Sequence, residues 1–304
     1  MWQEPVTARA GFPQDHRLFQ GFLPFAQRKT AERLTPYDVV LVLGAPVFTY
    51  YPYVPGPVVA KGTQVFQITD DPEEAVRAAV GTSVVGDLDL ATRSLVELLP
   101  KSDRPNPPRR ETPPVPDASA PMSVAYAMHA ISEAISRSEA PTVIVDESTS
   151  SKGVLHEYVK VNEPEGYHTS AAGGLGFCMP AAVGLKLALP DRQVVCVIGD
   201  GSSMYSIQAL YTAARHKLNI AFIVINNGGY SILKAFRDAT GLEDVPGLDL
   251  PGIDLVQIAR GFGCEGEAVK SPAELAPALA RAIAPDGPYL LDIVVDPAVP
   301  TVFG

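Results

Sequence analysis

Short apolar runs rich in β-branched residues alternate with amphipathic segments along most of the chain. The runs at residues 38–43 and 65–69 are typical of parallel strands that are covered on both faces, and helical patterns follow at 71–80 and 88–99. The alternation continues with strands predicted at 142–147, 193–200, 220–226 and 289–295 and helices at 122–138, near 172–189, at 204–216 and from 230. This order predicts an α/β fold, an open parallel sheet with helices on both faces.

A proline-rich segment interrupts this pattern. Residues 101–120 hold six prolines, which disfavour a regular helix or a central strand and favour an extended, semi-rigid connection. We therefore predict one α/β domain in residues 1–100, a linker, and a second domain in residues 121–304. Because residues 1–30 carry no clear strand and no complete βαβ unit, we expect the first domain to be only partly present.

Charge and composition narrow the classes of partner. The formal net charge is -10 and the pI is about 5.0, so the backbone of a nucleic acid or an anionic membrane would be repelled. No basic, apolar signal peptide begins the sequence, and no apolar run reaches the roughly 18 residues of a membrane helix. The three cysteines are too scattered for a disulfide framework or a metal cluster. We expect a soluble, cytoplasmic protein that binds neither nucleic acid nor membranes.

Three polar or glycine-rich loops follow predicted strands of the second domain, at residues 146–151, 199–203 and 226–230. In an open parallel sheet the carboxyl ends of the strands meet at one edge, and ligands bind there. We therefore expect the three loops to form a single site.

The sequence GDGSS at residues 199–203 favours a phosphate as the ligand. Ser202 and Ser203 are expected just before a helix, whose free N–H groups attract an anion. An aspartate beside a phosphate requires a cation between them, so Asp200 indicates Mg²⁺, which prefers oxygen ligands. Asn227 can supply an amide oxygen to the same ion, and Gly229 can supply a backbone carbonyl.

The spacing of the two motifs resembles a known cofactor signature. Either motif alone is also typical of an ordinary turn, but 24 residues separate Gly201 from Asn226, as in the thiamine diphosphate (ThDP) binding motif. The surrounding sequence is similar to the benzoylformate decarboxylase branch of the 2-oxo-acid decarboxylase and acetolactate synthase superfamily in LVLGAPVFTY, DESTSS, AAGGLGFCMPAAVG, VIGDGSSMYSIQALYTAA, NNGGYSIL and VPGLDLPGIDL. The resemblance implies a pyrophosphate-binding domain after the linker, preceded by part of the family's middle domain.

The resemblance also implies roles for individual residues. The implied Mg²⁺ ligands are Asp200, Asn227 and the carbonyl of Gly229. The implied diphosphate contacts are Thr149, Ser150, Gly201, Ser202, Tyr205 and Tyr230. Gly173 would face the aminopyrimidine of the cofactor, and Leu175 would lie under the cofactor and hold it bent, although a core leucine is the alternative. Ile232 and Phe236 would line the substrate pocket or face a core.

The sequence departs from the branch at several positions. The family glutamate that activates the cofactor belongs to a pyrimidine-binding domain that we expect to be absent from these residues. Tyr51 stands where the branch has a histidine, and Thr169 stands where it has an aromatic residue. We take both as candidates for the substrate pocket. His168 is the candidate for proton transfer, with a structural or solvated histidine as the alternative.

The resemblance implies ThDP- and Mg²⁺-dependent decarboxylation of an aromatic 2-oxo acid, benzoylformate to benzaldehyde and CO₂, with this chain as the cofactor-binding part of the enzyme. Two alternatives stay open, a carboligase like acetolactate synthase and a chain that binds ThDP and Mg²⁺ without turnover. We expect a small 2-oxo acid as substrate and either a homo-oligomer or a complex with a chain that carries the pyrimidine domain. A nicotinamide-binding domain is disfavoured because no G-x-G-x-x-G follows the first strand.

Overall fold

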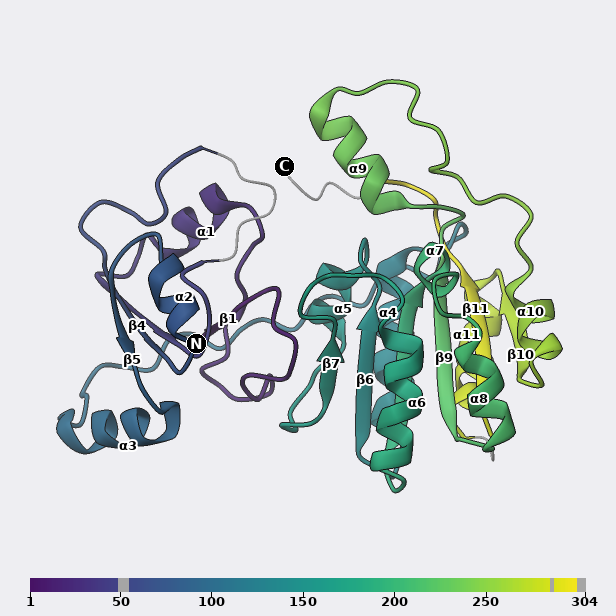
Figure 1. Cartoon of the computed structure of the whole chain (residues 1–304), viewed down its shortest axis with the longest axis horizontal. Coiled ribbons are helices and arrows are strands. Elements are labelled where there is room, and N and C mark those ends of the chain that lie inside the picture. The colour runs from purple at the N-terminus through teal and green to yellow at the C-terminus, as the bar shows by residue number, and fades with distance from the viewer. Residues whose placement is uncertain (49–54, 285–286, 300–304) are drawn as a thin grey trace. The chain divides into compact units, whose positions relative to one another are not determined.

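A computed structural model of the chain describes residues 1–48, 55–284 and 287–299 (Figure 1). These residues divide into two compact units. The first unit consists of Met1–Thr7 and His16–Arg110, and the second consists of Ala8–Asp15 and Glu111–Gly304.

The first unit contains a three-stranded parallel sheet of order β3-β4-β5 and a separate parallel pair, β1 with β2. Its strands are β1 (Trp2–Gln3), β2 (Gly21–Phe22), β3 (Val39–Leu43), β4 (Gln64–Thr69) and β5 (Thr82–Val85), and its helices are α1 (Gln27–Leu34), α2 (Pro72–Arg77) and α3 (Leu88–Leu98). Aspartates fix two helix starts, because Asp71 accepts from backbone amides of α2 and Asp87 from one of α3.

The second unit is built on a six-stranded parallel sheet of order β10-β11-β9-β8-β6-β7. Its strands are β6 (Thr142–Glu147), β7 (Tyr167–Thr169), β8 (Gln193–Gly199), β9 (Ile220–Asn226), β10 (Glu265–Val269) and β11 (Tyr289–Val294). Its helices are α4 (Val124–Ser136), α5 (Lys152–Tyr158), α6 (Cys178–Ala188), α7 (Asp200–Ser203), α8 (Ala209–Arg215), α9 (Ser231–Thr240), α10 (Leu255–Gly261) and α11 (Pro272–Ile283).

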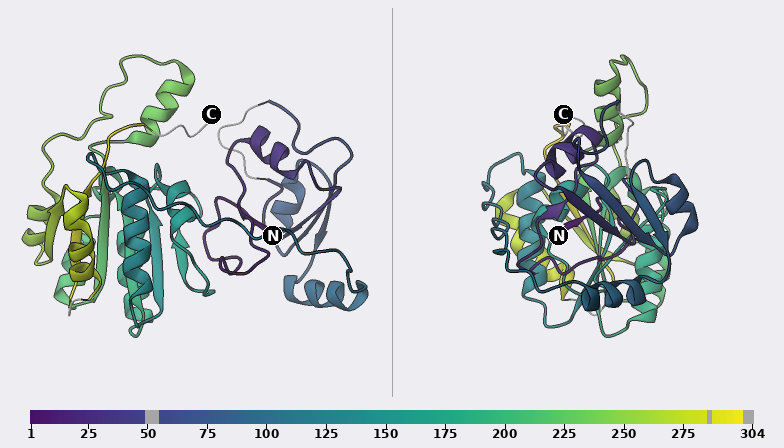
Figure 2. Two further views of the ribbon diagram at one scale, coloured as in Figure 1. Left: turned by 180° about the vertical axis from the view of Figure 1, so that it is seen from behind. Right: turned by 90° about the vertical axis from the view of Figure 1, so that its left-hand side faces the viewer.

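Helices cover both faces of this sheet. On one face α4, α5 and α11 pack over a buried cluster that includes Ile144 and Ile223, and the left view of Figure 2 shows teal α4 and yellow α11 in front of the strands. On the other face α6, α8 and α10 pack over a second cluster that includes Val145 and Phe222 (Figure 1). Because both faces are covered, β8 and β9 are continuous apolar runs rather than alternating ones.

The strand order creates a switch point between β6 and β8. From β6 the chain passes through α5 to β7 on one side, and after α6 it returns to β8 on the other side of β6. Successive connections therefore leave the sheet in opposite directions at the carboxyl ends of β6 and β8, which is the place where open parallel sheets bind ligands.

The structure confirms the α/β class and the parallel sheet with helices on both faces. Strands 142–147 and 220–226 lie where the periodicity predicts them. The helix predicted near 172–189 begins only at Cys178, because the glycine-rich stretch before it forms a loop. The helix predicted at 204–216 is wrong at its start, because α7 begins at Asp200 and α8 only at Ala209.

Residues 8–15 pair with the second unit, which differs from the expected assignment of residues 1–100 to one domain. The Thr169 N–H donates to the Ala8 carbonyl, and Gln14 exchanges hydrogen bonds with Val161. These bonds join positions about 150 residues apart in the sequence, so local periodicity carries no sign of them. The proline-rich residues 101–120 form neither helix nor strand.

Candidate functional site

The three polar loops that the sequence singles out follow adjacent strands, β6, β8 and β9. The register pairs Glu147 with Ile198 and Gly199 with Ile225, so the strands end side by side. The loops therefore meet at one edge, and the switch point lies between two of them. Figure 1 shows α7 at this edge and α9 beyond it.

Asp200 lies at the centre of the edge. The residue is 7 % exposed, and the backbone N–H groups of Gly201, Gly229 and Asn227 lie near enough to its carboxylate to favour the charged form. Burial raises the pKa of Asp200 above its ordinary value, and the backbone hydrogen bonds counteract this only in part. The structure thus joins the GDG and NN motifs in direct contact, with a buried carboxyl whose charge is only partly compensated.

Asn227 presents an acceptor that fits a cation. Its Oδ1 is buried and has no hydrogen-bond partner among the residues that the structure describes. A buried acceptor without a donor is costly, so an ion at this point would satisfy it. Together with the Asp200 carboxylate, the donor set is all oxygen, which suits Mg²⁺. Within the described ranges, no cluster of three His, Cys, Asp or Glu side chains offers a competing metal site.

The turn that carries Asn227 and Gly229 is fixed from two sides. Asn226 donates from Nδ2 to Asp292 Oδ2 at 3.2 Å and accepts from the Gly228 N–H at 3.1 Å. On the other side, Gly228 and Tyr230 form two backbone hydrogen bonds with the segment at 248–250. The turn is therefore held before any ligand arrives, which lowers the entropic cost of binding.

Two tyrosines connect this turn to the glycine-rich loop. The side chains of Tyr230 and Tyr205 lie close enough to interact, and a methyl at Gly201 would lie 2.5 Å from Cε1 of Tyr230. A methyl at Gly176 would lie 3.1 Å from Cβ of Tyr205. The structure thus brings together three predicted cofactor residues, Gly201, Tyr205 and Tyr230, and places them beside Gly176 of the glycine-rich loop. Ser202 is buried inside α7, and Ser203 donates to the Asp200 carbonyl at 2.7 Å, so neither serine precedes a helix as expected.

Thr149 and Ser150 lie on the turn after β6. Asp146 organises this turn, because its Oδ1 accepts from the N–H of Ser148 at 2.8 Å and from the Ser148 hydroxyl at 2.6 Å. Thr149 is exposed and Ser150 is half-buried. The turn is therefore placed at the same edge as α7 with side chains accessible to a ligand, and the two diphosphate roles stay predictions.

A buried polar network lies beneath this turn. Asp146, which has no exposed surface, accepts from the Tyr167 hydroxyl at 2.8 Å, and the Lys152 ammonium lies 3.4 Å from the same oxygen. Burial alone would raise the pKa of Asp146, but Lys152 and the bonds from Ser148 lower it below its ordinary value. The Tyr167 proton points to Asp146, so His156 Nε2 donates to the Tyr167 oxygen across 3.2 Å.

His156 should make the stability of the domain depend on pH. Burial lowers its pKa to about 4, against an ordinary value of 6.5, so the unfolded chain takes up the proton first. The neutral histidine therefore contributes stability above pH 6.5 that is lost as pH falls toward 4. From linkage we expect a loss of about 2 kcal/mol between pH 7.5 and pH 5.

His156→Gln, which does not titrate there, tests this contribution. Urea unfolding of both proteins at the two pH values should show a smaller pH dependence for the variant by about that amount. Equal pH dependence in the two proteins would contradict the assignment.

The glycine-rich loop holds Gly173 and Leu175. Gly173 is exposed with φ +69°, a conformation that favours glycine, and Leu175 is half-buried. Glu147 anchors the end of the loop, because its Oε1 accepts from the Gly176 N–H and its Oε2 from the Cys178 N–H, each at 2.8 Å. The roles predicted for Gly173 and Leu175 toward a cofactor stay predictions.

The residues predicted for the substrate pocket and for proton transfer do not lie together in one place. The Thr169 hydroxyl is buried, donates to the Asp146 carbonyl at 2.6 Å and accepts from Lys152, so its bonds lie inside the domain. His168 points to the opposite face of β7, 3.5 Å from a Glu165 oxygen, and burial lowers its pKa. Ile232 and Phe236 lie one turn apart on α9 and are half-buried, and Tyr51 lies outside the described residues.

Comparison with known proteins agrees with this geometry. Residues 147–293 match the family described as thiamine pyrophosphate enzyme, C-terminal TPP binding domain, where TPP is ThDP. The chain is 40% identical over 293 residues to a benzoylformate decarboxylase of Pseudomonas aeruginosa, which covers 96% of this chain and 55% of that protein. The chain belongs to the ThDP-dependent 2-oxo-acid decarboxylase and acetolactate synthase superfamily.

Other members of the superfamily match over different lengths. The solved structure of benzoylformate decarboxylase from Polynucleobacter necessarius superposes with a TM-score of 0.93 at 32% identity, over 98% of this chain and 57% of that one. The structure of a 4-hydroxybenzoylformate decarboxylase of Rhodococcus jostii superposes with a TM-score of 0.90 at 36% identity, over 97% of this chain and 56% of that one. Acetolactate synthase isozyme 1 large subunit of Escherichia coli is 36% identical over 138 residues, 45% of this chain and 25% of that protein. The chain thus spans about half the length of the decarboxylases it matches.

Sequence reasoning missed three buried acidic residues at this superfamily site, Asp146, Glu147 and Asp292. Each is a charged residue within or at the end of an apolar strand, and that pattern is the signal that could have found them. Their partners are backbone amides or side chains from other elements, so only their presence, and not their function, could have been inferred from the sequence.

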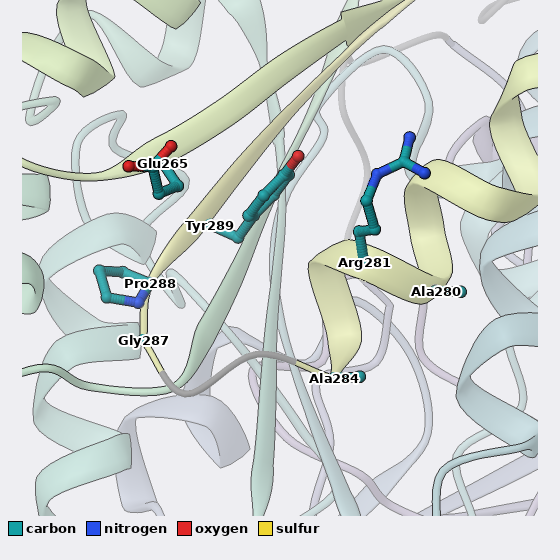
Figure 3. Close-up of a pocket in the computed structure, with 7 residues that line it drawn as sticks. All are labelled: Glu265, Ala280, Arg281, Ala284, Gly287, Pro288 and Tyr289. Atoms are coloured by element: carbon teal, nitrogen blue, oxygen red, sulfur yellow. The ribbon is translucent and has the colours of Figure 1, made fainter.

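A hollow of about 690 Å³ lies at the opposite, amino-terminal edge of the sheet, where β10 and β11 begin (Figure 3). Its polar groups include Arg281 and Tyr289, and both donate to Glu267, at distances between 2.7 and 2.8 Å. This pairing lowers the pKa of Glu267 and engages the hollow's two largest polar side chains. The hollow is separate from the candidate site.

In the described part of the chain, no helix is long and apolar enough to cross a membrane.

Proposed function

We propose that this chain forms the cofactor-binding part of an enzyme that decarboxylates an aromatic 2-oxo acid, benzoylformate to benzaldehyde and CO₂, with ThDP and Mg²⁺. The observation that carries the proposal is the contact between Asp200 and the turn at Asn227, with a buried acceptor left open, at the switch point of a superfamily fold. The similarity to two benzoylformate decarboxylases over nearly the whole chain supports the substrate class.

In this proposal the chain's own residues hold the cofactor at its charged end. Asp200, Asn227 and the Gly229 carbonyl would hold Mg²⁺, which neutralises a diphosphate that the buried carboxylate would otherwise repel. Hydroxyl and backbone groups around them would bind the phosphoryl oxygens, namely Thr149, Ser150, Gly201, Ser202, Tyr205 and Tyr230. When bound, ThDP supplies the nucleophilic carbon and the electron sink that decarboxylation requires.

The remaining residues would orient the rest of the cofactor and the substrate. Gly173 and Leu175 would fix the aminopyrimidine end, and the half-buried Ile232 and Phe236 would present apolar surface to an aromatic substrate. His168 would serve proton transfer only after a change of its surroundings, because its ring now lies beside Glu165.

The proposal extends to assembly and compartment. In this proposal the active form, which acts on a small 2-oxo acid, is a homo-oligomer or a complex with a chain that carries a pyrimidine-binding domain. All three cysteines are free and buried, which is compatible with the reducing cytoplasm that we propose. No nucleic acid or membrane takes part in the proposal.

Product analysis tests the reaction. Purified chain with ThDP and Mg²⁺ should release CO₂ and benzaldehyde from benzoylformate, alone or after addition of a pyrimidine-domain chain, and should do so faster than it consumes pyruvate. Acetolactate from pyruvate without any aldehyde would replace the decarboxylase by the carboligase alternative, which the match to acetolactate synthase supports. Saturable ThDP binding in calorimetry without CO₂ release would support binding without turnover.

A further inference from the structure

Strand β6 ends in two adjacent carboxylates that are both buried. Asp146 has no exposed surface and Glu147 is 4 % exposed. Because successive residues of a strand point to opposite faces, Asp146 points toward the face covered by α5, while Glu147 points toward the face covered by α6. The two side chains therefore act on different loops.

Glu147 caps a helix from another part of the chain. Helix α6 begins at Cys178, and its N-cap residue Phe177 makes no side-chain capping bond. The Glu147 carboxylate fills this role, since one oxygen accepts from the Cys178 N–H and the other from the Gly176 N–H. A negative charge at a helix start is favourable, because the first N–H groups of a helix lack partners within it.

The capping bonds also set the position of the glycine-rich loop. Gly176 has φ +93° and packs against Tyr205, which in turn lies close to Tyr230 beside Gly201. Glu147 therefore connects the loop at 173–177 to the edge that carries Asp200. Without the carboxylate, the buried N–H of Cys178 and the half-buried N–H of Gly176 would lose their acceptor at the point where the loop meets the helix.

We propose that Glu147 is a positioning residue of the cofactor site, which holds the loop at 173–177 in place for the heteroaromatic end of the ligand by accepting the Gly176 and Cys178 N–H groups. This inference rests on the proposed function for the identity of the ligand. Asp146 organises the neighbouring turn at 148–151, so the two carboxylates position different loops of the proposed site. One serves the ring end of the ligand and the other serves the phosphate end.

Hydrogen exchange of the ligand-free chain tests the structural step. In Glu147→Ala, the peptide covering residues 173–179 should exchange at least about 10-fold faster than in the wild type, while β8 and β9 keep their protection. Glu147→Gln can accept only one of the two bonds and should give an intermediate rate. Unchanged exchange at 173–179 in the alanine variant would overturn the proposal.

Calorimetry with two probes tests the positioning role. With Mg²⁺ present, Glu147→Ala should bind ThDP about 10- to 100-fold more weakly than the wild type. It should bind inorganic pyrophosphate, which lacks the rings, within about 3-fold of the wild type. Equal weakening for both probes would assign Glu147 a merely structural role and overturn the proposal. If Glu147→Ala does not fold, the same two affinities are measured for Glu147→Gln. Weaker binding of ThDP alone would support the proposal, and equal weakening for both probes would overturn it.

Asp254→Ala is the matched control. Asp254 also caps a helix with its carboxylate, accepting from the Gln257 N–H at 2.9 Å at the start of α10. Its loss should lower the urea midpoint of unfolding, as the loss of a helix cap does, and leave the preference for ThDP over pyrophosphate unchanged. A wild-type chain that binds neither probe would contradict the proposed function, and the exchange experiment would still decide the position of Glu147.

Discussion

Asp200→Asn is expected to lower the affinity for Mg²⁺ together with ThDP at least about 100-fold, because it removes the one charged group from the proposed set of metal ligands. The asparagine matches the aspartate in shape and can still accept from the backbone amides of Asn227 and Gly229. Titration calorimetry of ThDP at fixed Mg²⁺ measures the loss.

The same substitution should leave the ligand-free fold at least as stable as the wild type. Burial raises the pKa of Asp200, so at neutral pH the folded state holds a charge that the unfolded state holds more easily. Stability from this group is present at low pH and is lost as pH rises through the folded pKa. A neutral side chain removes that penalty, and urea unfolding without metal should show no decrease.

Asp191→Asn provides the control for charge. Asp191 is exposed just before β8, at the opposite edge of the sheet, and its replacement changes the net charge by the same amount. Its affinity for ThDP should stay within about 2-fold of the wild type, because exposed charges at this distance are screened. If both variants lost affinity alike, the effect would be one of net charge, and the assignment of Asp200 as a metal ligand would be wrong.

Gly229→Ala is expected to have the second largest effect, on both stability and metal binding. A methyl at this position would collide with the Leu248 carbonyl oxygen, which is the acceptor of the Tyr230 N–H. The turn must shift, at a cost of about 3 kcal/mol at the upper end of overpacking. Because the Gly229 N–H also lies near the Asp200 carboxylate, Mg²⁺ affinity should fall at least about 10-fold.

Gly266→Ala separates the two effects. A methyl at Gly266 would meet the Leu290 carbonyl oxygen in the same way, but Gly266 lies near the start of β10, away from the site. Urea unfolding should show a similar loss of stability, and calorimetry at a temperature where both variants are folded should show unchanged metal affinity. A Gly229→Ala protein with wild-type affinity would remove the turn from the metal site.

The sequence predicted the four inner strands of the six-stranded sheet, but it missed the edge strands β7 and β10 and predicted the loops poorly. Strands such as 220–226 are buried on both faces, and that environment requires an unbroken apolar run, which is visible in the sequence. The start of α6 could not be predicted, because its capping group is Glu147, a residue 31 positions away. The shift of α7 to Asp200 has a similar origin, since backbone contacts from the turn at Asn227 hold its first residue.

The sequence likewise could predict only part of the candidate site. Asp200 and Asn227 could be placed together from the sequence, because a helix and a strand between two loops return the chain to the same edge of a parallel sheet. Thr169 could not be understood in that way. The Thr169 hydroxyl donates to the backbone carbonyl of Asp146 on β6, whereas the neighbouring His168 points to the opposite face of β7.

By itself, the sequence determined the α/β class and the meeting of Asp200 and Asn227 at one edge of the sheet, the edge that we propose as the ligand site. These follow from periodicity and chain direction, which are local properties. Only the tertiary structure decided the strand order that places the switch point between β6 and β8, the open acceptor at Asn227, and the capping of α6 by Glu147. Each of these depends on which groups meet across long sequence separations, and that is fixed by packing of the two faces of the sheet rather than by any local pattern.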